Sequence, residues 1–367
     1  MAQRAFEMLE AMTGKRASDV HIKVGRPPLY RIDGKLIAET GAPLSEEDVE
    51  EVAFTLMTQR QREKFASNNE IDLAFSPGGD VRFRINIFRQ KGTIELVIRR
   101  IPKDIPRLED LNLPAVMKKI ANEARGLILL TGTVGSGKST TIASLIQHMN
   151  QNFQYHIVTI EDPIEFLHSD RNSSISQREL GIDTETYSIA LKYVLRQDPD
   201  VIFIGEMRDY ETVATAISAA ETGHLVLSTL HTIDAIQTMD RLVDFFPAGQ
   251  QAQVRGQLCS IITAIVSMRL IAKADGFGRV PAVEVMVGTP TVRNLIRENK
   301  MSHLKTVIQQ GASQSGMQTF DQSLADLYRK GLISLEQAVA EATSPSDLKL
   351  SLSGIVSSVD SAREHMR

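Results

Sequence analysis

The first hundred residues combine two hydrophobic periods, one typical of helices and one typical of strands. Apolar residues recur at helical spacing over Ala5–Thr13 and over Ser45–Ala66, where Ser45 is the expected N-cap. A turn is expected at Asp33-Gly34. Alternation of period two, which is typical of half-buried strands, occurs in Leu29–Ile37, Val81–Phe88 and Ile94–Ile98. This mixture predicts a small α+β domain over residues 1–100.

Prolines separate this domain from the rest of the chain. They lie in Ile101-Pro102-Lys103-Asp104-Ile105-Pro106. Each proline favours extended backbone in its predecessor and cannot donate a hydrogen bond to a strand ladder. We therefore predict an interdomain linker over residues 101–108, although the prolines could instead simply end a strand.

The remainder of the chain alternates short apolar runs with helical stretches. The runs are Leu127–Leu130, Ile157–Ile160, Val201–Ile204 and Leu225–Leu230. Helical patterns follow at Ser139–Met149, Tyr187–Leu195 and Glu211–Thr222. Strands that alternate with helices indicate a parallel sheet covered on both faces. The predicted class is α/β, with this second domain spanning residues 109–367 and ending in a helical part.

Composition and charge exclude several classes of protein. With 42% apolar residues the chain can build a core, and its net charge of −4 offers no general basic field for nucleic acid or anionic lipid. The single cysteine, Cys259, permits neither an intrachain disulfide nor a zinc site. The longest apolar run, Cys259–Ile271, is too short to span a membrane and predicts a buried helix. No signal peptide is apparent, so the cytoplasm is the expected compartment.

Residues 132–139 match the phosphate-binding pattern G-x-x-x-x-G-K-[ST] at every fixed position. Glycines in this pattern let backbone N–H groups close around a phosphate, and the helix that follows adds its N-terminal dipole. The match lies between an apolar run and a helical one, which favours this function over a structural turn. Lys138 is predicted to contact the β- and γ-phosphates and the Ser139 hydroxyl to bind Mg²⁺. The predicted ATP-binding residues are Gly132, Thr133, Val134, Gly135, Ser136, Gly137, Lys138, Ser139 and Thr140.

The apolar runs end in residues suited to phosphoryl transfer. Ligands of open α/β sheets bind at the carboxyl ends of the strands. Glu161-Asp162, Glu206 and His231 follow three of the runs, so we expect them to meet Lys138 at one edge of the sheet. Together they predict a site for ATP hydrolysis.

Roles within this site follow from chemistry. Glu206 is predicted to accept a proton from the attacking water, the alternative being a carboxylate that caps the next helix. Because Glu161 and Asp162 are adjacent, only one of them is predicted to face the nucleotide, and the other to hold Mg²⁺ through water or to cap a helix; the sequence does not decide which is which. His231 could sense the γ-phosphate or be an ordinary structural donor, and His224 is the weaker candidate of the two.

Arginines gather along the predicted strand 81–88. Arg82 and Arg84 share one face of this strand, and Arg99 lies close by in sequence. The composition of this segment favours a sheet face that is simply exposed to solvent. Two alternatives stay open, namely arginines that approach a triphosphate at a domain or subunit boundary, and a patch that binds nucleic acid.

Several segments resemble the secretion-ATPase superfamily, and within it the PilT-type retraction ATPases of type IV pili. Ala17–Ile22, Pro27-Pro28 and Arg31–Gly34 resemble the first, PAS-like domain of that family. Ile160–Glu165 resembles the Asp box of the family, and Thr222–Thr232 resembles its His box. Arg196–Asp209 resembles its Walker B segment, which has glycine in place of the usual aspartate. Thr291–Lys300 is similar to the retraction signature.

The resemblance implies a PAS-like N-terminal domain followed by a RecA-like P-loop NTPase domain, assembled as a homohexameric ATPase. It places Arg84 and Arg99 at the family's phosphate-contacting arginines and favours a functional His231. The implied catalytic set is Glu206, Glu161, His231, Arg84 and Arg99. The implied partners are an inner-membrane pilus platform protein and paralogous pilus ATPases, without nucleic acid or direct membrane insertion. The resemblance therefore places the protein in the cytoplasm, peripheral to the inner membrane.

The implied activity is pilus retraction, which drives twitching motility. Extension and type II secretion ATPases carry a longer N-terminal region and a four-cysteine insertion, whereas this chain begins at the first domain and has one cysteine. Thr133-Val134 replaces the usual Pro-Thr of the P-loop, and Thr291, Val292 and Asn299 depart from the retraction signature. Four alternatives stay open: an extension or secretion ATPase, an accessory PilU-like paralogue, a RecA-like nucleic-acid translocase, and a ring subunit that binds ATP but hardly hydrolyses it.

Overall fold

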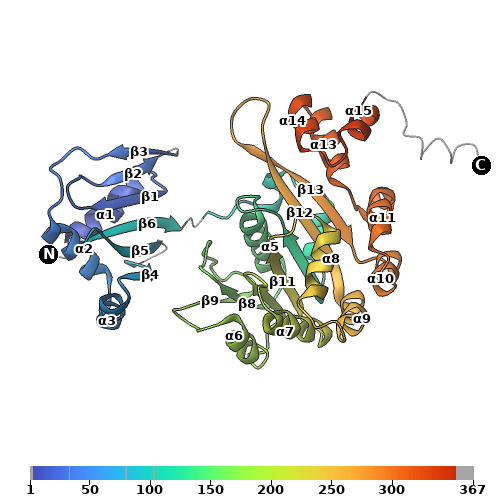
Figure 1. Ribbon diagram of the computed structural model, residues 1–367, viewed down its shortest axis with the longest axis horizontal. Helices are drawn as coiled ribbons and strands as arrows, with labels where there is room; N and C mark the ends of the chain where they lie inside the picture. The colour runs from blue at the N-terminus through green and yellow to red at the C-terminus, as the bar shows by residue number, and fades with distance from the viewer. Residues whose placement is uncertain (1–2, 33, 79–80, 102–103, 353–367) are drawn as a thin grey trace, which may run out of the picture. The chain divides into compact units, whose positions relative to one another are not determined.

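The computed structural model describes residues 3–32, 34–78, 81–101 and 104–352, which divide along the chain into two compact units (Figure 1). The first unit comprises the described residues up to Asp104 together with Glu165–Leu167, and the second comprises Ile105–Ile164 and the described residues from His168 onward. The predicted turn residue Asp33 and the linker residues Pro102 and Lys103 lie outside the described residues. Each unit contains helices and one sheet, which confirms the expected α/β class.

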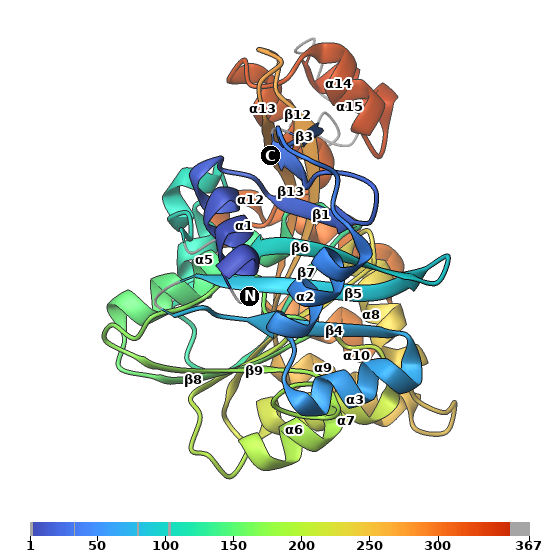
Figure 2. The ribbon, with the colours of Figure 1, turned by 90° about the vertical axis from the view of Figure 1, so that its left-hand side faces the viewer.

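The first unit is a six-stranded antiparallel sheet with helices packed on one face. Its strand order is β3-β2-β1-β6-β5-β4. Figure 2 shows β1, β6, β5 and β4 in this order, with α1 and α2 across them. Met12 and Val52 from the helices meet Ile85 and Leu96 from the sheet in the core. The elements are α1 (Gln3–Gly14), β1 (Asp19–Lys23), β2 (Leu29–Ile32), β3 (Lys35–Ala38), α2 (Glu46–Leu56), α3 (Gln59–Asn68), β4 (Glu70–Phe75), β5 (Arg82–Gln90) and β6 (Thr93–Ile101).

The predicted helix over 45–66 is two helices, which corrects that expectation. Met57 takes extended backbone, with φ −103° and ψ 136°, and ends α2. Thr58 then begins α3 as a new N-cap in a capping box with Gln61. The hydrophobic period continues across the break because both helices pack on the same core.

The second unit is built on a seven-stranded sheet in the order β13-β12-β7-β11-β10-β8-β9. Only the pairing of β13 with β12 is antiparallel among the described strand pairs of this sheet. The four predicted apolar runs are the adjacent parallel strands β7, β11, β10 and β8, so their carboxyl ends meet at one edge as expected. The strands are β7 (Gly126–Thr131), β8 (His156–Glu161), β9 (Ser174–Glu179), β10 (Val201–Ile204), β11 (Leu225–Leu230), β12 (Ile262–Ala272) and β13 (Arg279–Val287).

Helices cover both faces of this sheet (Figure 1), which explains why its central strands are continuously apolar. Ile142 and Leu145 of α5 pack on one face, and Val213 of α7 and Met239 of α8 pack on the other. The C-terminal helices form a further cluster against the outer part of β12 and β13. The helices are η1 (Leu108–Leu111), α4 (Val116–Ala121), α5 (Lys138–Asn152), α6 (Tyr187–Val194), α7 (Tyr210–Glu221), α8 (Ala235–Asp244), α9 (Gln251–Ile261), α10 (Pro290–Arg297), η2 (Met301–His303), α11 (Leu304–Gln310), α12 (Ala312–Ser315), α13 (Phe320–Arg329), α14 (Leu335–Glu341) and α15 (Pro345–Leu352).

The apolar run Cys259–Ile271 is mostly a strand, so the prediction of a buried helix was wrong. The helix α9 ends at Ile261 and β12 begins at Ile262. β12 lies between β7 and β13 and is buried on both faces over most of its length, which removes the alternation that marks exposed strands. Its Ile and Val residues favour the extended backbone.

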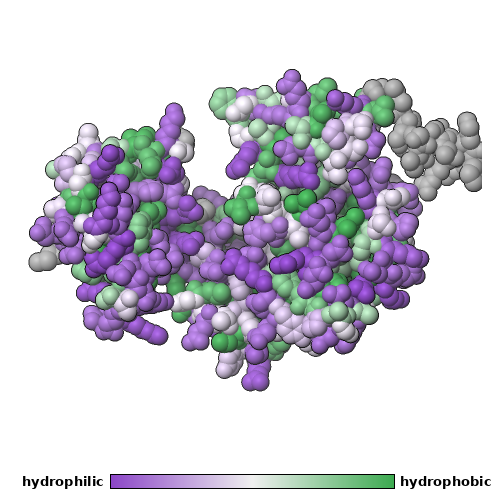
Figure 3. Space-filling view, viewed as in Figure 1, coloured by the Kyte–Doolittle hydropathy of each residue, from purple (hydrophilic) through white to green (hydrophobic). Residues whose placement is uncertain are grey.

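The surface is largely polar on the face shown in Figure 3, where apolar residues are scattered singly and in small groups. Within the part of the chain that the structure describes, none of the helices combines the length and the apolar character that crossing a membrane requires.

Three glutamates are buried among the described residues of the second unit, namely Glu161, Glu179 and Glu284. Glu284 of β13 is 7% exposed, and its Oε1 accepts a hydrogen bond from the backbone N–H of Ala235 at 3.0 Å. Burial raises the pKa of Glu284 from 4.5 to about 7, and the nearby Asp234 also raises it. The Ala235 N–H, Arg269 and Lys305 act in the opposite direction.

This pKa predicts a pH-dependent stability. Because the folded-state pKa of Glu284 is raised, its contribution to folding is fully present below pH 4.5 and is lost as pH rises through about 7. Glu284→Gln should therefore raise stability at pH 8 by up to roughly 3 kcal/mol and have little effect at pH 5. Thermal unfolding midpoints at both pH values check this. The exposed Glu298→Gln should lack this pH difference, and an equal change at both pH values for Glu284→Gln contradicts the prediction.

Candidate active site

The predicted phosphate-binding loop joins β7 to α5 and depends on glycine at particular places. Gly132 has φ 140°, and a Cβ there would lie 2.5 Å from the carbonyl oxygen of Met268. Gly137 has φ 98° and is the N-cap of α5. Both backbone conformations disfavour other residues, and at Gly132 the neighbouring strand β12 also excludes a side chain. The fold thus brings the loop close against β12, with the N-terminus of α5 directed at its interior.

Two side chains inside the loop are suited to phosphate. Lys138 is 8% exposed, and its Nζ donates to the carbonyls of Gly132 at 2.7 Å and Thr133 at 3.0 Å. The Oγ of Ser136 is buried and makes no hydrogen bond within the described residues. A buried hydroxyl without a partner is costly, so a ligand oxygen at this place would satisfy it. Ser139 and Thr140 follow in the first turn of α5 and are half-buried.

Glu206 lies beyond the end of β10, between two nitrogen-bearing side chains. Arg208 donates from Nε to Glu206 Oε2 at 2.8 Å, and His231 Nε2 lies 3.5 Å from Glu206 Oε1. Arg208 also approaches Asp162, with Nη1 4.0 Å from Oδ2. Glu206 and the electrostatic pull of nearby carboxylates raise the pKa of Arg208 further. The strand ends thus bring Asp162, Glu206 and His231 together, as predicted.

Glu161 and Asp162 differ in surroundings although they are adjacent in sequence. Glu161 is buried, and its Oε1 accepts from Thr159 Oγ1 at 2.7 Å and from Gln177 Nε2 at 3.1 Å. Asp162 is exposed. Both present hard oxygen atoms, the type of ligand that Mg²⁺ prefers, as does the Ser139 hydroxyl.

Steric crowding explains why position 205 is occupied by glycine. A Cβ there would lie 2.8 Å from Tyr187 Oη and 3.2 Å from the carbonyl oxygen of Ile160. Tyr187 of α6 thus occupies the space that a side chain at position 205 would need. Burial raises the pKa of the Tyr187 phenol, so its hydroxyl stays protonated.

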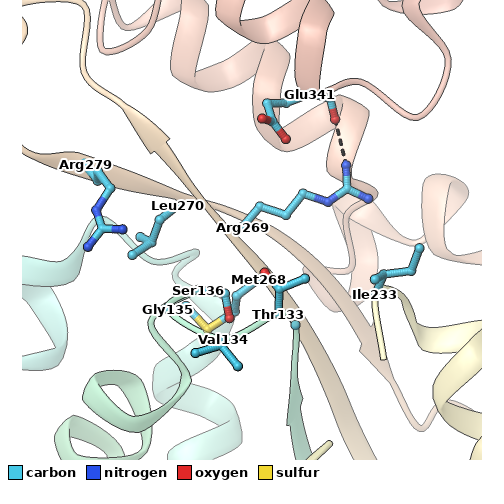
Figure 4. Close-up of a pocket in the computed structure, with 11 residues that line it drawn as sticks. Thr133, Val134, Gly135, Ser136, Ile233, Met268, Arg269, Leu270, Arg279 and Glu341 are labelled. Atoms are coloured by element: carbon cyan, nitrogen blue, oxygen red, sulfur yellow. Dashed lines mark hydrogen bonds between the residues drawn. The ribbon is translucent and has the colours of Figure 1, made fainter. Parts of the chain in front are cut away.

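A cavity of about 440 Å³ opens beside the P-loop. It is lined by Gly132–Ser136 of the loop and by Met268, Leu270 and Arg279 of β12 and β13, and Figure 4 shows Met268 beside Ser136. Arg269 reaches from the same hairpin to the carbonyl oxygen of Glu341 at 2.7 Å, and its guanidinium lies 4.0 Å from the ring centroid of Phe320. The cavity therefore has an apolar floor and a charged rim, and it shares residues with the phosphate loop.

A sequence profile of the family described as "Type II/IV secretion system protein" matches residues 3–279. This chain belongs to the type II/IV secretion system protein family. Its match covers the first unit and the second as far as residue 279, including the P-loop, Glu206 and His231.

Members of this family that act in type IV pili are similar over nearly the whole chain. The type IV pilus ATPase PilU of Pseudomonas aeruginosa is 43% identical, over 94% of this chain and 90% of its own length. The type IV pilus retraction ATPase PilT of the same organism is 44% identical, over 92% of this chain and 98% of its own. A crystal structure of the pilus retraction motor PilT with bound ADP matches with a TM-score of 0.87 and 44% identity, covering 94% of this chain and 98% of that one. This likeness confirms the expected order of an N-terminal domain and a RecA-like P-loop domain.

The predicted arginines lie in the first unit. Arg84 and Arg99 are directly opposite each other on β5 and β6. Arg99 Nε donates to Asp19 Oδ1 at 2.7 Å, and Arg84 Nη2 lies 3.8 Å from Asp72 Oδ1. The buried Asp19 also attracts Arg31, at 3.7 Å. The first unit thus presents a cluster of arginines on one face of its sheet.

His224 is not brought to the site. It precedes β11, whereas His231 follows it, so the two histidines lie at opposite ends of this strand. The His224 Nδ1 interacts with the carbonyl of Ala219 at 2.9 Å, at the C-terminal end of α7. This contact gives His224 a structural explanation.

Sequence reasoning missed three contributors to the site. Arg208 was visible only as part of a motif, although its position two residues after Glu206 places it on the same loop. Tyr187 and Arg279 are distant in sequence, and no local pattern marks them. Their roles depend on which strands and helices become neighbours.

Proposed function

We propose that this chain is the subunit of an ATP-hydrolysing motor that powers type IV pilus retraction. One observation carries the proposal: the P-loop lysine and the Glu206–His231 pair lie at the carboxyl ends of adjacent parallel strands of one sheet. The similarity to PilT and PilU over almost the full chain supports the pilus as the system in which the motor acts.

ATP has a matching site within the second unit. Its phosphates lie in the P-loop, where Lys138 and Ser136 provide donors and α5 provides its dipole. Its adenosine half lies in the adjoining cavity, whose size suits a nucleoside. Leu270 packs on the base and Arg279 supplies a guanidinium at its rim.

This assignment predicts a selective loss of affinity. Arg279→Ala should raise the Kd for ATP about five- to tenfold, the effect of losing one cation–π contact. The Kd for inorganic triphosphate should stay the same because the P-loop is intact. Isothermal titration with both ligands measures this. Arg241→Ala, which removes an arginine from the Phe245 ring outside the cavity, is the matched control. An equal loss of affinity for triphosphate would place the adenosine elsewhere.

Hydrolysis uses the groups at the strand ends. Glu206 accepts the proton of the attacking water, and His231 holds the other side of that carboxylate. Arg208 fixes the orientation of Glu206 and links it to Asp162. Ser139, with Glu161 or Asp162 through water, would hold Mg²⁺. When bound, Mg²⁺ neutralises charge on the β- and γ-phosphates.

The motor works as a homohexamer in the cytoplasm, attached to the inner membrane through a pilus platform protein. Arg84 and Arg99 stabilise the charge on the transferred phosphoryl group, a role that arginines fill in many phosphoryl-transfer enzymes. Loss of the γ-phosphate at Glu206 and His231 then changes the relation of the two domains and moves the platform.

Three measurements test this function, namely ATP hydrolysis, light scattering and complementation. The purified full-length protein should hydrolyse ATP only with Mg²⁺ and should have the mass of a hexamer in light scattering. Expressed in a strain that lacks its retraction ATPase, it should convert hyperpiliated cells to normal piliation and restore twitching. Cells that stay hyperpiliated and do not twitch would instead indicate an extension motor. ATPase activity that requires DNA and falls steeply with salt would indicate a translocase.

An accessory role of the PilU kind is the second candidate, because identity to PilU is 43% and to PilT 44%. Complementation separates them. A main motor restores retraction alone, whereas an accessory ATPase restores it only beside an active paralogue.

A further inference from the structure

A short loop carries His231 from β11 to α8. It comprises four residues, His231–Asp234, between Leu230 and Ala235. His231 faces Glu206, and Ile233 lines the cavity beside the P-loop. The loop therefore contributes to both halves of the candidate site. The loop is positioned by its two ends and by Thr232, whose Oγ1 lies 2.7 Å from Thr238 Oγ1 of α8.

Its first end is fixed by the sheet, because Leu230 of β11 pairs with Thr131 of β7. Its second end is held by a side chain of β13, an edge strand of the same sheet. The N–H of Ala235, the first residue of α8, donates to Glu284 Oε1 at 3.0 Å. The N-cap of α8 is a different hydrogen bond, in which Asp234 Oδ1 accepts from the N–H of Gln237 at 2.8 Å. Glu284 thus ties the loop to β13.

Glu284 stands in a buried polar row that begins at the P-loop. Thr131, the residue before Gly132, donates from Oγ1 to Ser267 Oγ at 2.8 Å. Ser267 is paired with Thr131 on one side and with Glu284 on the other. Thr131 and Ser267 are fully buried and Glu284 nearly so. The base of the phosphate loop and the end of the His231 loop therefore rest on the same level of one sheet.

A carboxyl group is a costly residue at this place. An apolar residue of similar volume would avoid the burial of an ionisable group. Ionisation of Glu284 near neutral pH lowers the stability of the folded protein. The value of this residue therefore lies in the hydrogen bond that it makes rather than in a contribution to folding.

We infer that Glu284 is a positioning residue for ATP hydrolysis, which acts by tethering the loop His231–Asp234 through the N–H of Ala235. The inference rests on the proposed function, because it assigns the loop a part in turnover. Glu284 touches neither Glu206 nor the P-loop in any described hydrogen bond, so it acts through His231. Removal of the tether lets the loop move and separates His231 from Glu206.

Three variants of the full-length protein isolate the tether. Glu284→Met removes the acceptor at similar volume, and Glu284→Gln keeps an oxygen acceptor. Ala235→Pro removes the donor instead and leaves Glu284 in place. Proline is tolerated at the first position of a helix, and Asp234 before it is already extended, with φ −155° and ψ 173°. Ala235→Pro thus tests the same hydrogen bond if Glu284→Met does not fold.

The matched control is Ser323→Ala. Ser323 of α13 accepts from the N–H of Val283 at 3.0 Å, so this variant also removes a buried tether between a helix and β13. It leaves the His231 loop untouched. A purely structural effect would be shared by this control.

The first readout is amide hydrogen exchange of peptides covering residues 231–238. We expect faster exchange in Glu284→Met and Ala235→Pro, and unchanged exchange in Glu284→Gln and Ser323→Ala. Unchanged exchange in both tether variants overturns the inference. This measurement does not depend on ATPase activity, so it decides the tether even if the proposed function fails for lack of turnover.

The second readout is a double-mutant cycle on turnover. Glu284→Met should lower kcat about tenfold with His231 present and less than about twofold in a His231→Ala background, as expected for residues that act together. Single-turnover rates at high enzyme concentration keep the slower variants measurable. A loss of equal size in both backgrounds overturns the inference, and it does so without contradicting the ATPase activity itself.

Discussion

Glu206→Gln is expected to bind ATP normally and to lower kcat by about 10²- to 10⁴-fold, the effect of losing a general base. Glutamine has the same size and can still accept from Arg208, so the loop keeps its geometry. Its neutral amide cannot take the proton of the attacking water. Single-turnover hydrolysis, together with titration of a slowly hydrolysed ATP analogue, separates the chemical step from binding.

Glu211→Gln is the matched control for this prediction. Glu211 is five residues further along, in the first turn of α7, where its Oε2 accepts from Ser188 Oγ at 2.8 Å. Its replacement should leave kcat unchanged. Normal turnover in the Glu206 variant would remove Glu206 from the catalytic role and leave Glu161 and Asp162 as the remaining carboxylates at the strand ends.

Lys138→Ala is expected to weaken ATP binding at least thirtyfold, roughly the 2 kcal/mol or more that a buried charge contact contributes. The ammonium group is held within the P-loop by the carbonyls of Gly132 and Thr133, so it can contact phosphate without reorganising the backbone. Alanine also leaves the negative charge of the triphosphate uncompensated in a buried place. Titration with ATP and with ADP measures the loss, which should be larger for ATP because it carries the γ-phosphate.

Lys118→Ala provides the comparison for Lys138. Lys118 is an exposed lysine of α4 whose Nζ pairs with Glu109 at 2.7 Å, away from the P-loop. Its loss should not alter nucleotide affinity. Equal affinity of wild type and Lys138→Ala for ATP would mean that the loop does not bind phosphate.

The sequence was sufficient where the signal is local. The P-loop pattern is read from consecutive residues, and the ends of four apolar runs predicted which side chains meet at the sheet edge. This worked because adjacent parallel strands necessarily bring their carboxyl ends together. His231, Glu206 and Asp162 lie in one cluster for that reason.

The sequence was insufficient where the period is ambiguous. A central strand buried on both faces, such as β12, has the same continuous apolar character as a buried helix. The break at Met57 was missed because α2 and α3 pack on the same core, which preserves the helical spacing on either side.

Contacts that depend on the last two strands of the sheet could not be predicted. The cavity wall joins Gly132 to Arg279, and the tether joins Ala235 to Glu284. Both depend on β12 and β13 adding to the sheet beside β7, and β13 was not anticipated. The partners of Arg84 and Arg99 were likewise set by strand pairing rather than by spacing.

The tyrosine hydroxyl beside Gly205 restricts how this site can evolve. An aspartate introduced at position 205 alone would have to displace the phenol of Tyr187, whose ring is packed in the core of the sheet. A single exchange at position 205 is therefore disfavoured, and paired replacement is the accessible route. Among homologous sequences we expect glycine at 205 to accompany a large aromatic residue at 187, and an acidic residue at 205 to accompany a smaller one.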